Sequence, residues 1–401
     1  MVSARLTNLG ATELRASSSL FKIIIIILLG CPNKKEKSYV HTVHFYLQFS
    51  SSTFMAHSII ENANIVIFEV LDTVRGHASR ACLTFSNFIF YIRINIHRTF
   101  PAISFAILAG MGVTAGAHRL WAHRAYKAKW PLRVYLAIMQ TMAFQNHIYE
   151  WVRDHRVHHK FSETDADPHN ARRGFFFAHM GWLMVRKHKD VLEKGASIDM
   201  SDLEQDPIVM FQKKTYLVIM PLLSFILPAY APVALWGEDP WTSWYVASIF
   251  RYTISLHCTW LVNSAAHIWG NKPYDKNIGP TENKLVSILA TGEGWHNYHH
   301  VFPWDYKAAE LGNYRTNFST AFIDVAAKYG LAYDLKTVSE EMIKRRVSRT
   351  GDGTHPSLSC SKQIIDEDGH CHPENPVWGW GDEDMTEDDK KLAEVSHVKL
   401  E

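Results

Sequence analysis

The sequence predicts an all-α integral membrane protein in which a helical cytosolic cap holds a histidine-rich site for two metal ions. Two observations predict this fold. Long uncharged runs can cross a bilayer as helices, and three groups of histidines flank one pair of such runs. The chain has 401 residues and a net charge of +2, so it has no strong field that would attract nucleic acid. Its five cysteines show neither disulfide nor metal-type spacing, which fits a reducing compartment.

Two runs without any charge are long enough to span a membrane, residues 99–117 and 215–237. A helix of about 20 apolar residues crosses the roughly 30 Å hydrocarbon core of a bilayer. A third run, residues 240–263, is apolar apart from Arg251 and His257, and only a short acidic turn separates it from the second run. The second and third runs therefore predict a helical hairpin across the membrane. Buried core helices of a soluble protein are the alternative.

The charges near the hairpin predict its orientation. Lys213 and Lys214 precede it, while Glu238 and Asp239 occupy its turn. Because basic residues tend to stay on the cytosolic side, both open ends of the hairpin are expected there. Two crossings also return the chain to the side from which it started. Arg251 would be costly in lipid, so we expect this side chain to face protein.

Three histidine clusters are spaced like metal ligands: HRLWAH at 118–123, HRVHH at 155–159 and HNYHH at 296–300. Residues three and four apart share one face of a helix, so the histidines of each HxxHH cluster can converge. Eight histidines are more than one ion takes, because tetrahedral sites are full at four ligands and octahedral sites at six. The count therefore predicts two metals. The alternative is a set of ordinary surface or core histidines.

The first cluster requires a local irregularity. His118 and His123 are five residues apart, which on an ideal helix turns them about 140° away from one another. We therefore expect His118 at the end of one helix and His123 after a bend or at the start of the next.

The two ends of the chain differ from its middle. Residues 1–98 form an atypical N-terminal region whose apolar runs are short or interrupted, so it supplies no clear first membrane span. From residue 354 to residue 401 the composition is acidic and polar, which predicts a disordered tail. Residues 303–348 are predicted to be helical, with Thr337 and Glu340 forming a capping box.

Four longer segments contain the histidines and their surroundings: GVTAGAHRLWAHRAYKA, EWVRDHRVHHKFSETDADPHN, TWLVNSAAHIWGNKPYD and GEGWHNYHHVFPWDY. In this order around an uncharged hairpin, they resemble the membrane-bound acyl-CoA delta-9 desaturases, a stearoyl-CoA desaturase-like family. The long acidic tail resembles the insect type. By this resemblance, residues 99–353 are identified as a membrane-bound desaturase domain.

The resemblance implies an architecture and a reaction. It implies a bundle of four transmembrane helices and a cytosolic cap with two iron ions (Fe²⁺), in a multi-pass protein of the endoplasmic reticulum membrane. It implies an oxidoreductase that introduces a cis double bond into a saturated fatty acyl-CoA, with dioxygen and with electrons from cytochrome b5 and its reductase. A redox-inert ion such as Zn²⁺ could not support attack on an unactivated C–H bond, so this reaction favours iron.

The resemblance also implies the metal ligands. A ninth histidine joins the eight clustered ones, and Asn263 holds a water on the metal. The implied set is His118, His123, His155, His158, His159, His267, His296, His299 and His300, with Asn263 acting through water. No catalytic residue beyond these ligands is expected.

Substrate contacts follow from the same match. For coenzyme A, the matching residues are Arg153 and Asp154 at the adenosine, Arg186 and Lys187 near the phosphates, and Asn146, Trp151 and Trp260 near the pantetheine or the tunnel mouth. For the acyl chain, Gln145, Trp151 and Thr259 would hold a bend at the metals, Trp182 would line the tunnel, and Ala106, one turn from Ala102, would form its floor. A bent tunnel would place one pair of methylenes beside the metals and so determine where the double bond forms.

Two other interpretations stay open on sequence grounds. A membrane fatty-acid or sterol hydroxylase could use a similar histidine scaffold, although the five-residue spacing of the first cluster and the NSAAH segment favour desaturation. A catalytically inactive desaturase paralogue, acting as a scaffold or lipid binder, is the other alternative because of the atypical N-terminal region.

Overall fold

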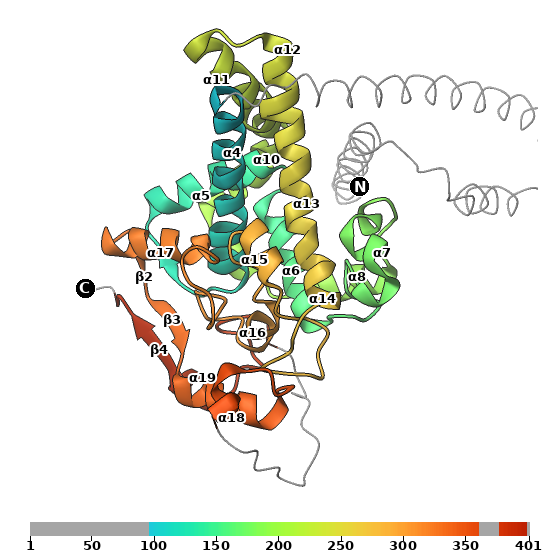
Figure 1. Cartoon of the computed structure of the whole chain (residues 1–401), viewed down its shortest axis with the longest axis vertical. Coiled ribbons are helices and arrows are strands. Elements are labelled where there is room, and N and C mark those ends of the chain that lie inside the picture. The colour runs from blue at the N-terminus through green and yellow to red at the C-terminus, as the bar shows by residue number, and fades with distance from the viewer. Residues whose placement is uncertain (1–95, 361–376, 399–401) are drawn as a thin grey trace, which may run out of the picture. The chain divides into compact units, whose positions relative to one another are not determined.

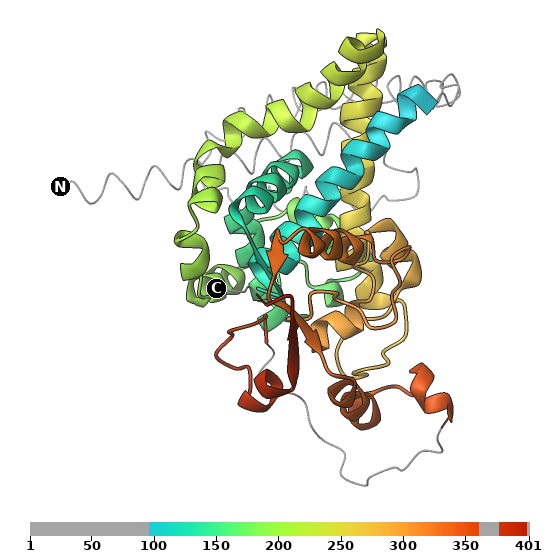
Figure 2. The same ribbon diagram turned by 90° about the vertical axis from the view of Figure 1, so that its left-hand side faces the viewer.

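The computed structural model describes residues 96–360 and 377–398, and most of the elements among them are helices (Figure 1). The expected N-terminal region, apart from its last three residues, and any first span within it lie outside the described residues. Three long rods of helix and a cap of shorter elements make up the described part of the chain. Figures 1 and 2 show the rods extending away from the cap in the same direction.

Each rod joins α-helix to π-helix without a break. The rods are α4 (Ile96–Met111) with η1 (Gly112–Ala122); α10 (Pro207–Pro221) with η4 (Leu222–Ile226) and α11 (Leu227–Trp236); and α12 (Pro240–Ser243) with η5 (Trp244–Phe250) and α13 (Arg251–Asn263). Helix α4 contacts α11 and α13, and α5 (Trp130–Ala143) packs against η1. Gly112 permits this last contact, because a Cβ there would collide with the backbone of Gln140 in α5.

The second rod has the surface of a helix that faces lipid. Among the described residues, two helices are long and apolar enough to cross a membrane, Phe100–Ala122 and Pro207–Trp236. Only 22% of the most apolar stretch of Pro207–Trp236 is buried, and Val218 and Leu235 are 70% and 75% exposed. A core helix of a soluble protein would bury such side chains, so the exposed apolar face argues against that alternative.

The predicted hairpin is present as a turn between the second and third rods. Helix α11 ends at Gly237, which has a φ of 72°, and Asp239 caps α12 by accepting from the backbone N–H of Thr242. The third rod, which corresponds to the predicted run 240–263, is not among the described helices that are long and apolar enough to cross a membrane. Arg251 is buried and donates to the carbonyls of Ala247 and Ser224, so the expectation that it faces protein is confirmed.

The cap is built on α6 (Ile148–Lys160) and α16 (His296–Val301), which carry the second and third histidine clusters. The other helices are α7 (Phe175–His179), α8 (Lys189–Ser197), α9 (Ser201–Glu204), α14 (Ala265–Ile268), α15 (Lys284–Leu289), α17 (Phe318–Lys328), α18 (Glu340–Thr350) and α19 (Glu387–Leu392), with 3-10 turns at Ala171–Arg173, Gly181–Leu183 and Pro356–Cys360. Strand β1 (Lys127–Ala128) pairs antiparallel with β2 (Ala332–Tyr333), and β3 (Leu335–Val338) with β4 (Ala393–Ser396).

Several local predictions in the cap differ from the structure. Residues 303–348 were predicted to be helical, but only α17 and the part of α18 within them are, because β2 and β3 lie between these two helices. The capping-box prediction is wrong: Thr337 lies in β3, and Ser339 caps α18 by accepting from the backbone N–H of Met342. Within the tail that is predicted to be disordered, the described residues 377–398 include α19 and β4, whereas residues 361–376 lie outside the described part of the chain. Strand β4 is held by β3, a long-range pairing that the composition of the tail does not reveal.

Candidate metal centre

The nine predicted ligand histidines lie together in two adjoining groups. One group holds His118, His123, His155, His159 and His299, and the other holds His158, His267, His296 and His300. Within each group the ring nitrogens lie within 4.8 Å of one another. The structure therefore divides nine histidines, which lie on η1 and its C-cap, α6, α14 and α16, into a group of five and a group of four.

A π-helix brings the first cluster together. The backbone N–H of His123 donates to the carbonyl of His118 at 3.1 Å, which is an i to i+5 hydrogen bond. Residues five apart then lie one turn above each other, and the rings of His118 and His123 are 4.7 Å apart. His118 lies near the end of η1 and His123 is the residue directly after it, so both histidines lie at a helix end as expected. The π-helical hydrogen bond, rather than a break between them, brings their rings together.

The distances between ring nitrogens fit metal coordination. Nε2 of His118 is 2.9 Å from Nε2 of His299, and the corresponding distance between His123 and His155 is also 2.9 Å. In the group of four, Nε2 of His296 lies 3.0 Å from that of His267 and 3.1 Å from that of His300. Two ligands at right angles, each about 2.1 Å from one ion, have nitrogens about 3.0 Å apart, whereas a tetrahedral angle gives about 3.4 Å. The spacing therefore fits an ion with more than four ligands.

Hydrogen-bond acceptors beside Nδ1 of three histidine rings also indicate a metal site. Nδ1 of His118 lies 2.8 Å from Glu293, Nδ1 of His158 lies 2.9 Å from Asp167, and Nδ1 of His123 donates to the carbonyl of Trp378. When Nδ1 carries the proton, a neutral ring has only a lone pair at Nε2. Lone pairs that face one another at hydrogen-bond distance need a cation between them, so this donor set fits metal ions.

Glu293, Asp167 and Trp378 were missed by the reasoning from sequence. Carboxylates and carbonyls that hold the second ring nitrogen are typical of histidine metal sites. Glu293 lies three residues before His296, and Asp167 lies nine after His158, inside segments already singled out. A search for carboxylates next to the clusters could have found these two residues, whereas the Trp378 carbonyl carries no signal of its own.

Burial lowers the pKa of several of the ligand histidines. Burial, reinforced by neighbouring imidazoles, lowers the pKa of His123, His155, His159, His299 and His300 well below the usual range. Neutral imidazole is the form that binds metals. Burial by itself would raise the pKa of Glu293, but Arg119 and His118 outweigh it and lower that pKa to about 2.

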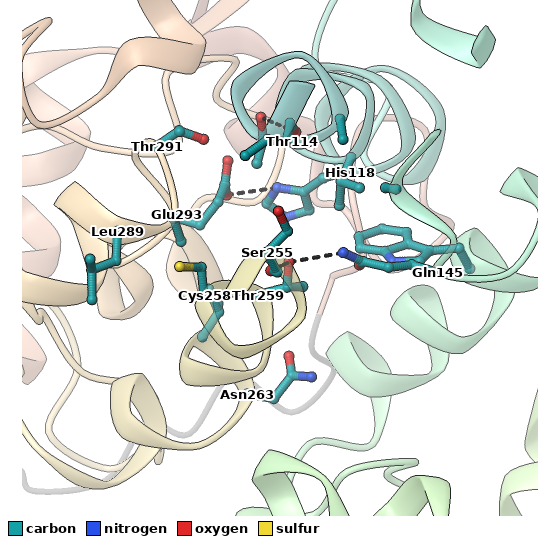
Figure 3. A pocket seen from close by; sticks show the side chains of 18 of the residues that line it. Thr114, His118, Gln145, Ser255, Cys258, Thr259, Asn263, Leu289, Thr291 and Glu293 are labelled. Carbon is teal, nitrogen blue, oxygen red and sulfur yellow. Dashed lines mark hydrogen bonds and ion pairs between the residues drawn. The ribbon is translucent and has the colours of Figure 1, made fainter. Parts of the chain in front are cut away.

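A cavity leads to both histidine groups. Its wall comes from α4 and η1, from α13, and from residues 289–293, and it includes His118, His155, His158 and His296. Figure 3 shows Gln145 and Thr259 facing one another across it, with Nε2 of Gln145 donating to Oγ1 of Thr259 at 3.0 Å. Trp151, Asn263 and Ala106 also line the cavity, and the Trp151 ring stacks on His155.

Comparison with known proteins identifies the kind of protein to which this site belongs. A family model described as fatty acid desaturase matches residues 97–333. The chain belongs to the fatty acid desaturase family. It is 61% identical to an acyl-CoA delta-9 desaturase of Acheta domesticus, over 78% of this chain and 82% of that protein. It is 56% identical to an acyl-CoA delta12-desaturase of the same organism, over 84% and 87%, and 57% identical to stearoyl-CoA desaturase of Homo sapiens, over 64% and 71%.

This fatty acid desaturase is therefore an oxidoreductase of lipid metabolism with a histidine-rich metal site, in a membrane-bound family. Its family membership agrees with the resemblance read from the four segments. The relatives differ in the bond that their names specify, so the family alone leaves the position of the double bond open.

Three residues that were predicted to lie at the pantetheine, the tunnel mouth or the tunnel wall do not line the cavity. Trp260 is buried against His179, with ring centroids 5.7 Å apart. Trp182 packs edge-on against His169 and borders a separate surface pocket with Arg186 and Lys187. Asn146 sits at a φ of 69° just before α6, where its carbonyl accepts from Gln140. The resemblance assigns both tryptophans to the wall or mouth of the acyl tunnel, and this assignment stays a prediction.

The four predicted polar residues for coenzyme A lie close together on the cap. Lys187 pairs with Asp154 at 2.5 Å and with Glu150 at 3.3 Å, and Arg153 pairs with Asp154 at 3.1 Å. Arg153, Asp154 and Lys187 border one open cleft, and Arg186 is exposed in the adjoining pocket. This arrangement presents cationic side chains that could release a carboxylate partner and bind phosphate.

Proposed function

We propose that this desaturase is an acyl-CoA delta-9 desaturase that introduces a cis double bond into a saturated fatty acyl chain. It uses dioxygen and electrons delivered by cytochrome b5 and its reductase. The observation that carries the proposal is one cavity, mostly apolar, that reaches two groups of neutral imidazoles. The similar proteins are acyl-CoA desaturases, which favours an acyl-CoA substrate, and 61% identity to a delta-9 enzyme favours that position.

Two Fe²⁺ ions are the proposed cofactors. The group of five histidines would hold one ion, and the group of four would hold the other together with a water bound to Asn263, which lines the same cavity. When bound, iron supplies the redox chemistry that breaks an unactivated C–H bond, which Zn²⁺ cannot supply. Glu293, Asp167 and the Trp378 carbonyl orient the rings so that Nε2 stays available.

The substrate would lie with its acyl chain in the cavity and its coenzyme A on the cap. Ala106 would border the distal part of the chain, and the Gln145–Thr259 pair with Trp151 would hold it beside the histidines. Arg153, Asp154, Arg186 and Lys187 would bind the coenzyme A moiety, with Trp182 beside the last two. Asn146 and Trp260 do not line the cavity, so they would support the residues that contact the substrate rather than touch it themselves. The small apolar lining excludes water, and the polar pair orients the chain.

The proposed setting is the endoplasmic reticulum membrane. The two apolar rods and the third rod with Arg251 would cross the bilayer with one further span, which makes a four-helix transmembrane bundle under a cytosolic cap. Residues 99–353 would form the desaturase domain, with residues 1–98 before it and the acidic residues 354–401 after it. Exposed apolar side chains on the second rod support lipid contact.

Expression in a yeast strain that requires unsaturated fatty acids tests the proposal. Rescue is expected, with a double bond at carbon 9 of a saturated precursor. A double bond at carbon 12 would refute the delta-9 position but leave the proposed acyl-CoA desaturation intact. A hydroxylated product would favour the hydroxylase alternative, and a well-expressed chain that fails to rescue would favour the inactive paralogue.

A further inference from the structure

A segment near the C-terminus bonds to one of the histidines through main-chain atoms. Residues 377–385, VWGWGDEDM, are called the strap here. The carbonyl of Trp378 accepts from Nδ1 of His123, and the backbone N–H of Trp380 donates to the carbonyl of His123 at 2.9 Å. The strap therefore holds both the ring and the backbone of the same residue.

The strap is anchored on the elements that carry the histidines. The indole of Trp378 is 4% exposed and lies 4.8 Å from the guanidinium of Arg124 and 4.3 Å from that of Arg156. These arginines directly follow His123 and His155 in sequence. Cationic groups over an aromatic face are attractive, and more so where water is excluded.

The carboxylate of Asp382 bonds both to the strap itself and to α6. Asp382 accepts from the backbone N–H of Trp378 at 2.7 Å and pairs with Nζ of Lys160 at 2.9 Å. Lys160 follows His159 in sequence, so Asp382 connects the strap to a second histidine-bearing position. Asp382 is 2% exposed, which keeps these contacts away from competing water.

Gly379 shows how closely the strap approaches. A Cβ at this position would lie 2.7 Å from Cα and 2.9 Å from the carbonyl carbon of His123. Such distances are too short for a real side chain, and the atoms concerned belong to backbone that cannot rotate away. Even alanine would therefore push the strap away from His123.

We propose that the strap positions His123 in the group of five histidines. By accepting from Nδ1, the Trp378 carbonyl keeps the proton on that nitrogen and leaves Nε2 directed at the other four rings. This inference rests on the proposed function, in which His123 binds iron. Because the contacts of the strap described above concern the group of five, loosening it should release one ion and leave the ion held by the group of four.

Three full-length variants test this role: Gly379→Ala, Asp382→Asn and, as the matched control, Glu383→Ala. Glu383 is an exposed strap residue beside Asp382. The measurements are iron per chain in purified protein, the rate at which a chelator removes iron, and helix content from circular dichroism. Wild type and Glu383→Ala should hold two irons, and Gly379→Ala about one. Asp382→Asn should lose one of two irons at least about tenfold faster than wild type.

Each outcome decides the question. Wild-type iron content and release rates in both Gly379→Ala and Asp382→Asn would overturn the role of the strap while leaving the proposed function intact. Simultaneous loss of both ions would also overturn it, because a merely structural defect releases both. If Gly379→Ala loses its helix content, the result for Asp382→Asn decides, because this substitution adds no heavy atom to the contact. A wild-type chain without iron would instead refute the proposed function, and the strap role with it.

Discussion

Replacing Glu293 with glutamine isolates the role of the carboxylate behind the first histidine cluster. Glu293 accepts from Nδ1 of His118 at 2.8 Å and pairs with Arg119 at 2.8 Å, and both partners are buried. The amide keeps the size of the side chain but removes its charge. Loss of an outer partner of a metal-bound histidine costs about 10- to 100-fold in metal affinity, which is about 1.4–2.7 kcal/mol.

The same substitution leaves a buried arginine without its anion. Removing one partner of a buried ion pair costs about 3–5 kcal/mol. Arg119 also donates to the Tyr306 carbonyl, Thr320 and Asn317, so the lower end, about 3 kcal/mol, is expected. Titration of the iron-free chain with Fe²⁺ measures the affinity, and thermal unfolding in detergent measures the stability.

Asp275→Asn is the matched control for stability. Asp275 is fully buried and pairs with Arg346 at 2.6 Å, but its side chain touches none of the nine histidines. This variant should be destabilised to a similar extent while it binds iron like wild type. Unchanged iron affinity in Glu293→Gln, or equal weakening in both variants, would refute the reasoning.

Three further predictions follow from the site and the cap. His158→Ala should abolish double-bond formation while membrane insertion, measured by fractionation, stays intact; retained product would contradict its assignment as a ligand. Asp202→Asn should lower the free energy of unfolding by about 2 kcal/mol at neutral pH. Burial alone would raise the pKa of the Asp202 carboxyl, but hydrogen bonds from Arg124 and Arg156 outweigh burial and lower that pKa from 3.8 to about 2. A depressed carboxyl pKa stabilises the fold above its unfolded value, so the deficit should shrink as the pH falls from about 4 toward 2, and a deficit independent of pH in unfolding curves would contradict this. Ala106→Leu should narrow the cavity and shift the products toward shorter acyl chains. An unchanged fatty-acid profile would contradict a role of Ala106 in limiting the length of the acyl chain.

The parts of the site that sequence predicts well are those determined within one helical turn. His155, His158 and His159 lie on α6 and His296, His299 and His300 on α16, because three- and four-residue spacing gives a shared helix face whatever surrounds it. The hairpin was predictable for a similar reason, since its acidic turn interrupts two uncharged runs. The prediction that all three histidine clusters lie on the same side of the membrane followed from the hairpin, because its two crossings return the chain to the side from which it started.

What sequence could not predict depends on contacts between distant segments. The π-helix around His118 has no recognised local signal in the sequence, and η1 packs against α5, α6 and the more distant α17. Trp182 and Trp260 are assigned to the tunnel only by their position in the sequence, which does not determine the direction of their rings. The strap lies in a tail whose average composition indicates disorder, although two tryptophans within three residues, Trp378 and Trp380, are unusual for a disordered segment and could have marked it.

Titration of the purified, iron-free chain with Fe²⁺ under anaerobic conditions tests the central claim most directly. If five histidines hold one ion and four hold another, two equivalents should bind per chain, and His123→Ala and His267→Ala should each reduce the number to one. Binding of a single ion or of none by the wild-type chain would contradict the account.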